Sequence, residues 1–141
     1  MKRITTLMIG GLLCGAANIA MAADPAASAP AAATPAPLIS QTELLTRLEK
    51  KDPGLVVLDV RTPVEFAAGH VPGAKNISHD ELPAKLAELA AHKDQEVVLY
   101  CRSGRRTQIA EGTLRSAGFT RLLHLEGDYL AWEAEKRPVE K

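Results

Sequence analysis

The segment Tyr100–Thr107, which reads Tyr-Cys-Arg-Ser-Gly-Arg-Arg-Thr, constrains the fold of this chain more than any other stretch. It ends an apolar, β-branched-rich run, Val97–Tyr100, that has the length of a strand. The residues that follow carry apolar side chains at 109, 110 and 114, as on one face of a helix. Cys101 is therefore predicted to leave a buried strand in a tight loop that enters a helix.

A cysteine in such a loop has a distinctive chemical setting. The start of a helix presents unpaired backbone N–H groups and the positive end of the dipole. Gly104 permits a backbone conformation in which successive N–H groups turn inward to bind an anion. Arg102, Arg105 and Arg106 lie within five residues of the sulfur. These features favour the nucleophilic thiolate, so we interpret Cys101 as reactive, against the alternative of a buried structural cysteine.

The N-terminal residues have the pattern of a secretory signal peptide. A basic start, residues 1–3, precedes a largely apolar stretch, 7–19, and a small-x-small site, 20–22. We therefore expect residues 1–22 to be removed by cleavage after Ala22, which leaves no stable membrane anchor. This predicts export, and a periplasmic location in a Gram-negative cell.

Cleavage would change the cysteine count and the charge. The mature chain would lose Cys14 and keep Cys101, so it would have no internal disulfide. It would also lose Lys2 and Arg3 from 17 basic residues, leaving 15 against 17 acidic residues and a formal charge of −2. The basic residues around Cys101 are then a local feature, which disfavours nucleic acid as a partner and favours a small anion.

The remaining sequence predicts one domain after a tether. Residues 23–37 are rich in Ala and Pro and are expected to form a disordered linker before a domain at 38–141. Expected strands lie at 55–58, 74–77, 96–100 and 122–125, and expected helices at about 40–51, 62–65, 80–91, 107–116 and 129–136. This alternation predicts an α/β domain with a mainly parallel sheet. Ligands of such sheets bind beyond the carboxyl ends of strands, where Cys101 and Asp59 both fall.

Other polar residues are weaker candidates. Asp59 and Arg61 are interpreted as a structural ion pair that supports the loop, with a catalytic role as the alternative. His70 is expected to be a hydrogen-bonding turn residue, and His92 and His124 are expected to have no nearby partner with which to build a site. The sequence has no pattern of metal ligands, no phosphate-binding glycine motif and no flavin signature, so no metal and no cofactor are predicted.

Several motifs together resemble the rhodanese family over roughly residues 39–132. In order, they are Asp59–Arg61 with Glu65-Phe66, Gly69–Ala74 with Asn76-Ile77, Tyr100–Thr107, Gly118-Phe119 and Leu125–Trp132. The small exported single-domain rhodaneses of bacteria, such as the phage-shock type, are the most similar kind. The resemblance implies a three-layer domain whose central, mainly parallel five-stranded sheet has helices on both faces. One departure is Gly127-Asp128, where the family often has two glycines. Asp tolerates a left-handed backbone, so the turn is expected to persist.

The resemblance also implies a thiosulfate sulfurtransferase. Cys101 would take the outer sulfur of thiosulfate as a persulfide and pass it to cyanide or a thiol. The substrate-binding residues would be those of the loop: Arg102, Ser103, Gly104, Arg105 and Arg106. Arg102 and Arg105 would attract the dianionic donor, and Arg106 would alternatively brace the loop by pairing with an acid.

Three other functions remain open. One is a periplasmic sulfur carrier that hands its sulfur to a partner protein, and another is a non-catalytic rhodanese-like binding module. The third, and weakest, is a cysteine phosphatase or arsenate reductase. Those enzymes place five residues between the cysteine and the arginine, whereas this chain has four, 102–105, between Cys101 and Arg106.

Overall fold

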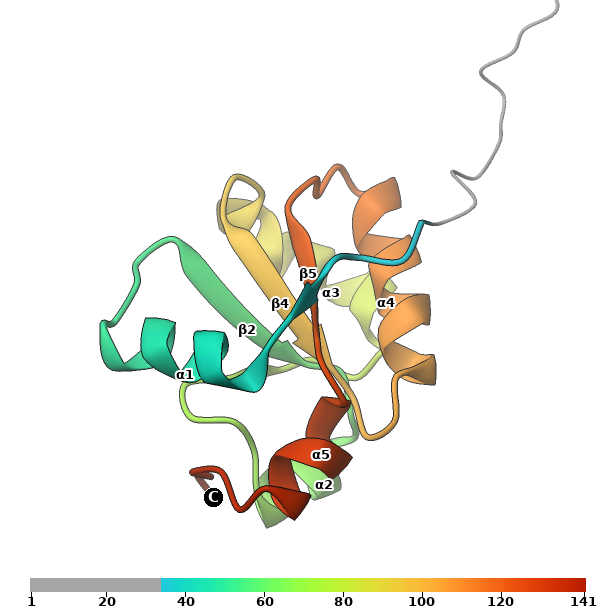
Figure 1. Cartoon of the computed structure of the whole chain (residues 1–141). Coiled ribbons are helices and arrows are strands. Elements are labelled where there is room, and N and C mark those ends of the chain that lie inside the picture. The colour runs from blue at the N-terminus through green and yellow to red at the C-terminus, as the bar shows by residue number, and fades with distance from the viewer. Residues whose placement is uncertain (1–33) are drawn as a thin grey trace, which may run out of the picture. The chain divides into compact units, whose positions relative to one another are not determined.

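A computed structural model describes residues 34–141 of the chain (Figure 1). The predicted signal peptide, residues 1–22, and most of the predicted linker, residues 23–33, lie outside the described residues. The folded part begins before residue 38, since Ala36 is buried and its N–H donates to Glu111 Oε2 at 3.0 Å. No helix within residues 34–141 is long and apolar enough to cross a membrane.

The domain is built on a five-stranded sheet with the order β1-β5-β4-β2-β3. The strands are β1 (Leu38–Ile39), β2 (Leu55–Asp59), β3 (Lys75–Asn76), β4 (Glu96–Tyr100) and β5 (Leu122–Leu125). All neighbouring strands pair in parallel, which confirms the predicted sheet. Only β1 had no strand pattern of its own. It is two residues long and pairs with β5 at the edge of the sheet.

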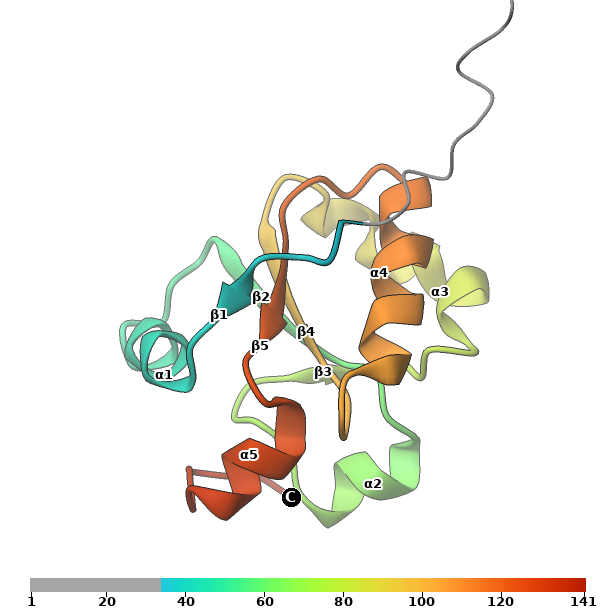
Figure 2. The same ribbon diagram turned by 45° about the vertical axis from the view of Figure 1, so that its right-hand side comes forward.

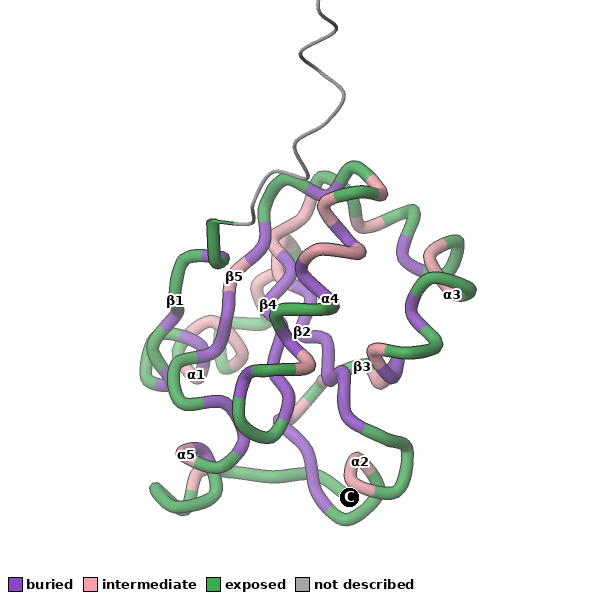
Figure 3. Tube along the Cα trace, turned by 90° about the vertical axis from the view of Figure 1, so that its right-hand side faces the viewer, coloured by how far each residue is buried: buried purple, intermediate pink, exposed green. Residues whose placement is uncertain are grey.

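Helices cover both faces of this sheet (Figures 1 and 2). They are α1 (Gln41–Glu49), α2 (Pro63–Ala68), α3 (Leu82–Leu89), α4 (Arg105–Ser116) and α5 (Asp128–Ala134), with a 3₁₀ turn, η2 (Ala90–His92), after α3. Side chains alternate along each strand, so β4 sends Val97 and Leu99 into a core shared with α3 and α4. It sends Val98 and Tyr100 into a second core shared with α1 and α5. The buried segments gather along the central strands in Figure 3.

Local sequence signals set most helix boundaries. Ser40 caps α1 by accepting a hydrogen bond from Glu43 N at 3.1 Å. Thr62 and Glu65 form a capping box at the start of α2, with Pro63 in its first turn. The predicted helix 80–91 is shorter in the structure, because α3 begins at Leu82, next to Pro83, and gives way to the 3₁₀ turn at Ala90.

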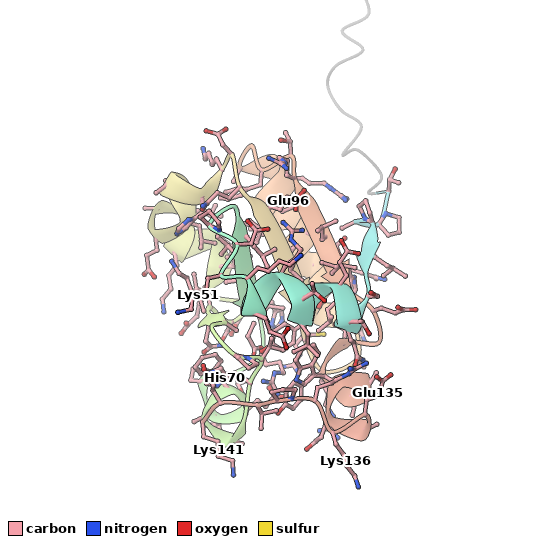
Figure 4. All side chains as sticks on the ribbon, turned by 60° about the vertical axis from the view of Figure 1, so that its left-hand side comes forward. Lys51, His70, Glu96, Glu135, Lys136 and Lys141 are labelled. Carbon is pink, nitrogen blue, oxygen red and sulfur yellow. The ribbon has the colours of Figure 1, made fainter. Side chains whose placement is uncertain are left out.

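The C-terminal tail pairs with the turn that follows α2. His70 N donates to Glu140 O, and Glu140 N donates to His70 O, both at 2.9 Å. Figure 4 shows His70 close to the end of the chain at Lys141. His70 Nδ1 lies 2.9 Å from Phe66 O, which confirms that this histidine is a hydrogen-bonding turn residue.

The sheet topology determines where a ligand can bind. From β4 the chain crosses to β5, on one side, while from β2 it crosses to β3, on the other. The carboxyl ends of β2 and β4 are adjacent, with Asp59 opposite Tyr100. A crevice opens beyond such a switch point in parallel sheets. The segments that enter it are those that begin with Asp59 and Cys101.

Candidate active site

Cys101 lies directly after β4, at the bottom of the loop that leads into α4. It is 1% exposed, and it is the free cysteine within the described residues. Gly104 takes the left-handed conformation, with φ of 103°, and its N–H donates to Cys101 Sγ at 3.0 Å. Glycine adopts this φ without the steric cost of a side chain. The loop therefore turns a backbone N–H toward the sulfur.

The first turn of α5 forms backbone hydrogen bonds with the same loop. Tyr129 N donates to Cys101 O at 3.0 Å, and Leu130 N donates to Arg102 O at 3.2 Å. These N–H groups belong to a helix start and have no partner within the helix. Two carbonyl oxygens of the loop are thereby held toward α5, and the carbonyl groups do not compete for the space around the sulfur.

The three arginines of the loop have different environments. Within residues 34–141, the exposed side chains of Arg102 and Arg105 form no ion pair. Arg106 makes a bidentate pair with Glu65 of α2, at 2.7 and 2.8 Å. The hydrogen bond from Arg106 lowers the pKa of Glu65 to about 2. Ser103 is exposed at the tip of the loop.

Asp59 and Arg61 form a buried ion pair next to the loop. Arg61 Nη2 lies 2.6 Å from Asp59 Oδ2, and the two residues are 3% exposed or less. The same guanidinium donates to Gly69 O at 2.8 Å and lies 3.9 Å from the centre of the Tyr129 ring. The pair links the end of β2 to the turn after α2 and to α5.

A pocket of about 180 Å³ opens between α2 and α5 beside the loop. Its lining residues are Arg61, Glu65, Ala68, Gly69, Arg102, Tyr129, Leu130 and Glu133. Figure 2 shows both helices below the carboxyl ends of the strands, on either side of the approach to the β4–α4 loop. The pocket carries groups of both charges and an apolar side chain, Leu130, that is 45% exposed.

The prediction that His124 has no partner is wrong. His124 Nδ1 lies 3.0 Å from Glu111 Oε1, and Nε2 lies 2.9 Å from Asp128 Oδ2. The hydrogen bonds of Asp128 and Glu111 raise the pKa of His124 to about 9. Glu111 falls between Ala110 and Leu114 on the apolar face of α4, and this charged residue on a buried face was the available sequence signal. His92 also has neighbours, with its Nε2 2.9 Å from Lys75 Nζ.

The departure at Gly127-Asp128 keeps its turn and adds contacts. Asp128 has φ of 52°, so the left-handed backbone persists as expected. Its Oδ1 accepts from Cys101 N at 2.9 Å and from Thr107 Oγ1 at 3.1 Å. A glycine at this position would offer the loop neither contact.

Comparison with known proteins places this geometry in a family. The model of the Rhodanese-like domain matches residues 40–135. A protein of Allochromatium vinosum named sulfurtransferase is 37% identical over 72% of this chain and 92% of its own length. The chloroplastic rhodanese-like domain-containing protein 15 of Arabidopsis thaliana is 35% identical over 62% of this chain, which spans about half (54%) of that protein.

A solved structure agrees with this assignment at the level of the fold. The crystal structure of a protein from Anabaena sp. has a TM-score of 0.66 and 31% identity, and the match covers 72% of this chain and 81% of that one. The family model matches residues 40–135, which include every strand from β2 to β5 and the Cys101 loop. The chain therefore belongs to the rhodanese-like domain family.

Proposed function

We propose that this protein is a sulfurtransferase that carries sulfane sulfur as a persulfide on Cys101, with thiosulfate as donor and cyanide or a thiol as acceptor. The observation that carries the proposal is the 3.0 Å contact from Gly104 N–H to Cys101 Sγ. The same loop carries Arg102 and Arg105, which form no ion pair within residues 34–141. The A. vinosum relative, named a sulfurtransferase, supports the reaction class.

The first half-reaction forms the persulfide. The Cys101 thiolate attacks the outer sulfur of thiosulfate, a new S–S bond forms, and the S–S bond of thiosulfate breaks with its electron pair leaving on sulfite. The negative charge on the outer sulfur of the persulfide then lies among backbone N–H groups at the start of α4. Donors that are already oriented stabilise such charge without reorganisation. In the second half-reaction, cyanide or a thiolate takes the outer sulfur, and the Cys101 thiolate is restored.

The arginines divide the remaining work. Arg102 and Arg105 draw the dianionic donor to the loop, since their side chains are exposed. Arg106 braces the loop against α2 through Glu65. We expect Arg102→Ala and Arg105→Ala each to raise KM for thiosulfate, on the order of ten-fold for a lost charged hydrogen bond. An effect on KM confined to Arg106→Ala would overturn this division.

A mass measurement tests the persulfide directly. The purified protein and its Cys101→Ser variant are incubated with thiosulfate, freed of excess donor and compared by intact mass. Cyanide is then added while thiocyanate is followed. We expect one added sulfur on the wild type alone, removed by cyanide. Because the full sequence has a second cysteine, Cys14, the variant also locates the sulfur. No added sulfur and no thiocyanate would reject the reaction with this donor.

The rival functions predict other results in the same experiment. A sulfur carrier would form the persulfide but discharge it faster to a protein thiol than to cyanide. A binding module would form none. A phosphatase would hydrolyse an aryl phosphate, which a parallel assay checks. Export of the protein stays a proposal, tested by the N-terminus of the protein recovered from the periplasm.

A further inference from the structure

A chain of buried polar contacts runs from the start of the folded domain to the Cys101 loop. Ala36 N donates to Glu111 Oε2 at 3.0 Å, and the other carboxylate oxygen of Glu111 lies 3.0 Å from His124 Nδ1. On its far side, His124 Nε2 lies 2.9 Å from Asp128 Oδ2. Asp128 then accepts from Cys101 N at 2.9 Å. Glu111, His124 and Asp128, the ionisable residues of this series of contacts, are 1%, 8% and 5% exposed, so solvent does not replace these contacts.

The geometry defines the protonation of this triad. Both ring nitrogens of His124 face a carboxylate oxygen, one from α4 and one from the start of α5. A neutral imidazole has one N–H donor and one bare nitrogen, which would meet a carboxylate lone pair. Both carboxylates are bonded only if His124 carries two protons and a positive charge. Buried charges need such pairing, since an isolated one is strongly disfavoured.

The triad lies directly under the part of the loop that contacts the sulfur. A Cβ built on Gly104 would come within 3.1 Å of Asp128 Oδ2 and 3.6 Å of His124 Cε1. Gly104 is the residue whose N–H donates to Cys101 Sγ. Asp128 also binds both ends of the loop, through Cys101 N and Thr107 Oγ1. Its orientation therefore determines where the loop, and the sulfur within it, can rest.

We propose that Glu111, His124 and Asp128 are positioning residues of the sulfur-transfer site: His124, held between the two carboxylates, fixes the Asp128 carboxylate that anchors the Cys101–Thr107 loop. This inference rests on the proposed sulfurtransferase function. Asp128 touches the loop and not the reacting sulfur. Glu111 and His124 act only through Asp128, so their effect is on the geometry of the loop and not on the binding of the donor.

The mechanism predicts a specific kinetic pattern. Glu111→Gln and His124→Gln leave the exposed Arg102 and Arg105 in place, so KM for thiosulfate is expected to change little. The rate of persulfide formation at saturating thiosulfate should fall on the order of 10- to 100-fold, the cost of a small misplacement of reacting groups. His92→Gln is the matched control, because His92 precedes the amino end of β4, whereas Cys101 follows its carboxyl end. It should leave the rate unchanged.

The pH profile separates positioning from general loss of structure. Deprotonation of His124 removes one of its two hydrogen bonds to Glu111 and Asp128, the charged groups that contact it from α4 and α5. The wild-type rate should fall as pH rises through about 9, and the remaining rate of His124→Gln should lack that fall. Urea unfolding of each variant defines conditions in which it is fully folded. Glu111→Gln retains an acceptor for Ala36 N, which makes it the milder substitution if His124→Gln does not fold.

A second readout does not depend on thiosulfate. The rate at which iodoacetamide alkylates Cys101, located by peptide mass, should change in Glu111→Gln and His124→Gln and not in His92→Gln. This measurement stays informative if thiosulfate is not the donor, so it distinguishes failure of the proposed function from failure of this inference. Folded triad variants with wild-type alkylation and transfer rates would overturn the inference. So would a change in KM alone, or a pH profile identical to that of the wild type.

Discussion

Replacement of Asp59 by asparagine should destabilise this domain far more than the loss of one charge at its surface. Asp59 is fully buried, and its carboxylate accepts from the side chain and the backbone N–H of Arg61. In Asp59→Asn the buried guanidinium keeps its bond to Gly69 O and its contact with Tyr129 but loses its counter-ion. Breaking one side of a buried pair costs about 3–5 kcal/mol, and the two remaining contacts favour the lower end, about 3 kcal/mol.

A double-mutant cycle tests the origin of that loss. In Asp59→Asn with Arg61→Met, no charge is left unpaired, and the asparagine oxygen still accepts from the backbone N–H of residue 61. The double variant should therefore be more stable than Asp59→Asn alone, because an apolar side chain tolerates burial better than an unpaired charge. Urea unfolding followed by the fluorescence of Trp132, the single tryptophan of the sequence, measures all four proteins.

Two outcomes would contradict the predicted cost of the unpaired Arg61. If Asp59→Asn loses less than about 1 kcal/mol, the pair is not a buried ionic contact of the kind that makes removal of one partner costly. If the two single losses simply add in the double variant, the loss does not come from an unpaired charge. Glu81→Gln is the matched control at an exposed pair with Lys85, where no measurable loss is expected.

Three further results are expected. The lowered pKa of Glu65 means that its pairing with Arg106 stabilises the fold above about pH 4.5 and that this stabilisation is lost as pH falls toward 2. In Glu65→Gln, the unfolding free energy should be lower by about 1–2 kcal/mol at neutral pH and should lack this fall in acid, as measured by urea unfolding across pH. The raised pKa of His124 acts in the opposite direction: its contribution is complete below about pH 6.5 and is lost as pH rises through about 9, so the unfolding free energy should fall in that window for the wild type and not for His124→Gln. Gly104→Ala should lower the unfolding free energy by about 1 kcal/mol or more, because of the positive φ, and should also slow sulfur transfer. Gly73→Ala has a φ of 74° and no neighbouring atom within 4 Å of the added Cβ, so it should lower stability without slowing the transfer.

Strand positions followed directly from apolar runs, and the fold was predictable to that extent. The stretches at 96–100 and 122–125 matched the observed strands because both are mostly apolar and, apart from Glu96 at the start and His124 within β5, are buried between two layers as apolar runs. β1 was not predictable, since a two-residue strand has no periodicity of its own and forms only by pairing with β5. The end of the helix predicted at 80–91 depended on packing that changes the last turn to 3₁₀.

The site was predictable where its chemistry is local in sequence. Cys101, Gly104 and the arginines lie in one loop, so their spacing alone placed them together. The partners of His124 could not be found in the same way. Glu111 lies 13 residues before it, on a helix, and reaches it only because α4 packs beside β5. Contacts of that kind depend on how layers meet, which periodicity does not specify.

The loop is held by three kinds of contact, which respond differently to salt and to pH. The Arg106–Glu65 pair is partly exposed, so salt and acid weaken it. The N–H groups of α5 that bind Cys101 O and Arg102 O do not titrate. The triad is buried, and it loses one of its two His124 hydrogen bonds when His124 loses a proton. In acid, the brace to α2 is lost as Glu65 takes up a proton, and in alkali the triad loses a hydrogen bond as His124 gives one up. The loop should therefore hold its geometry best at intermediate pH, where both ionic contacts are intact.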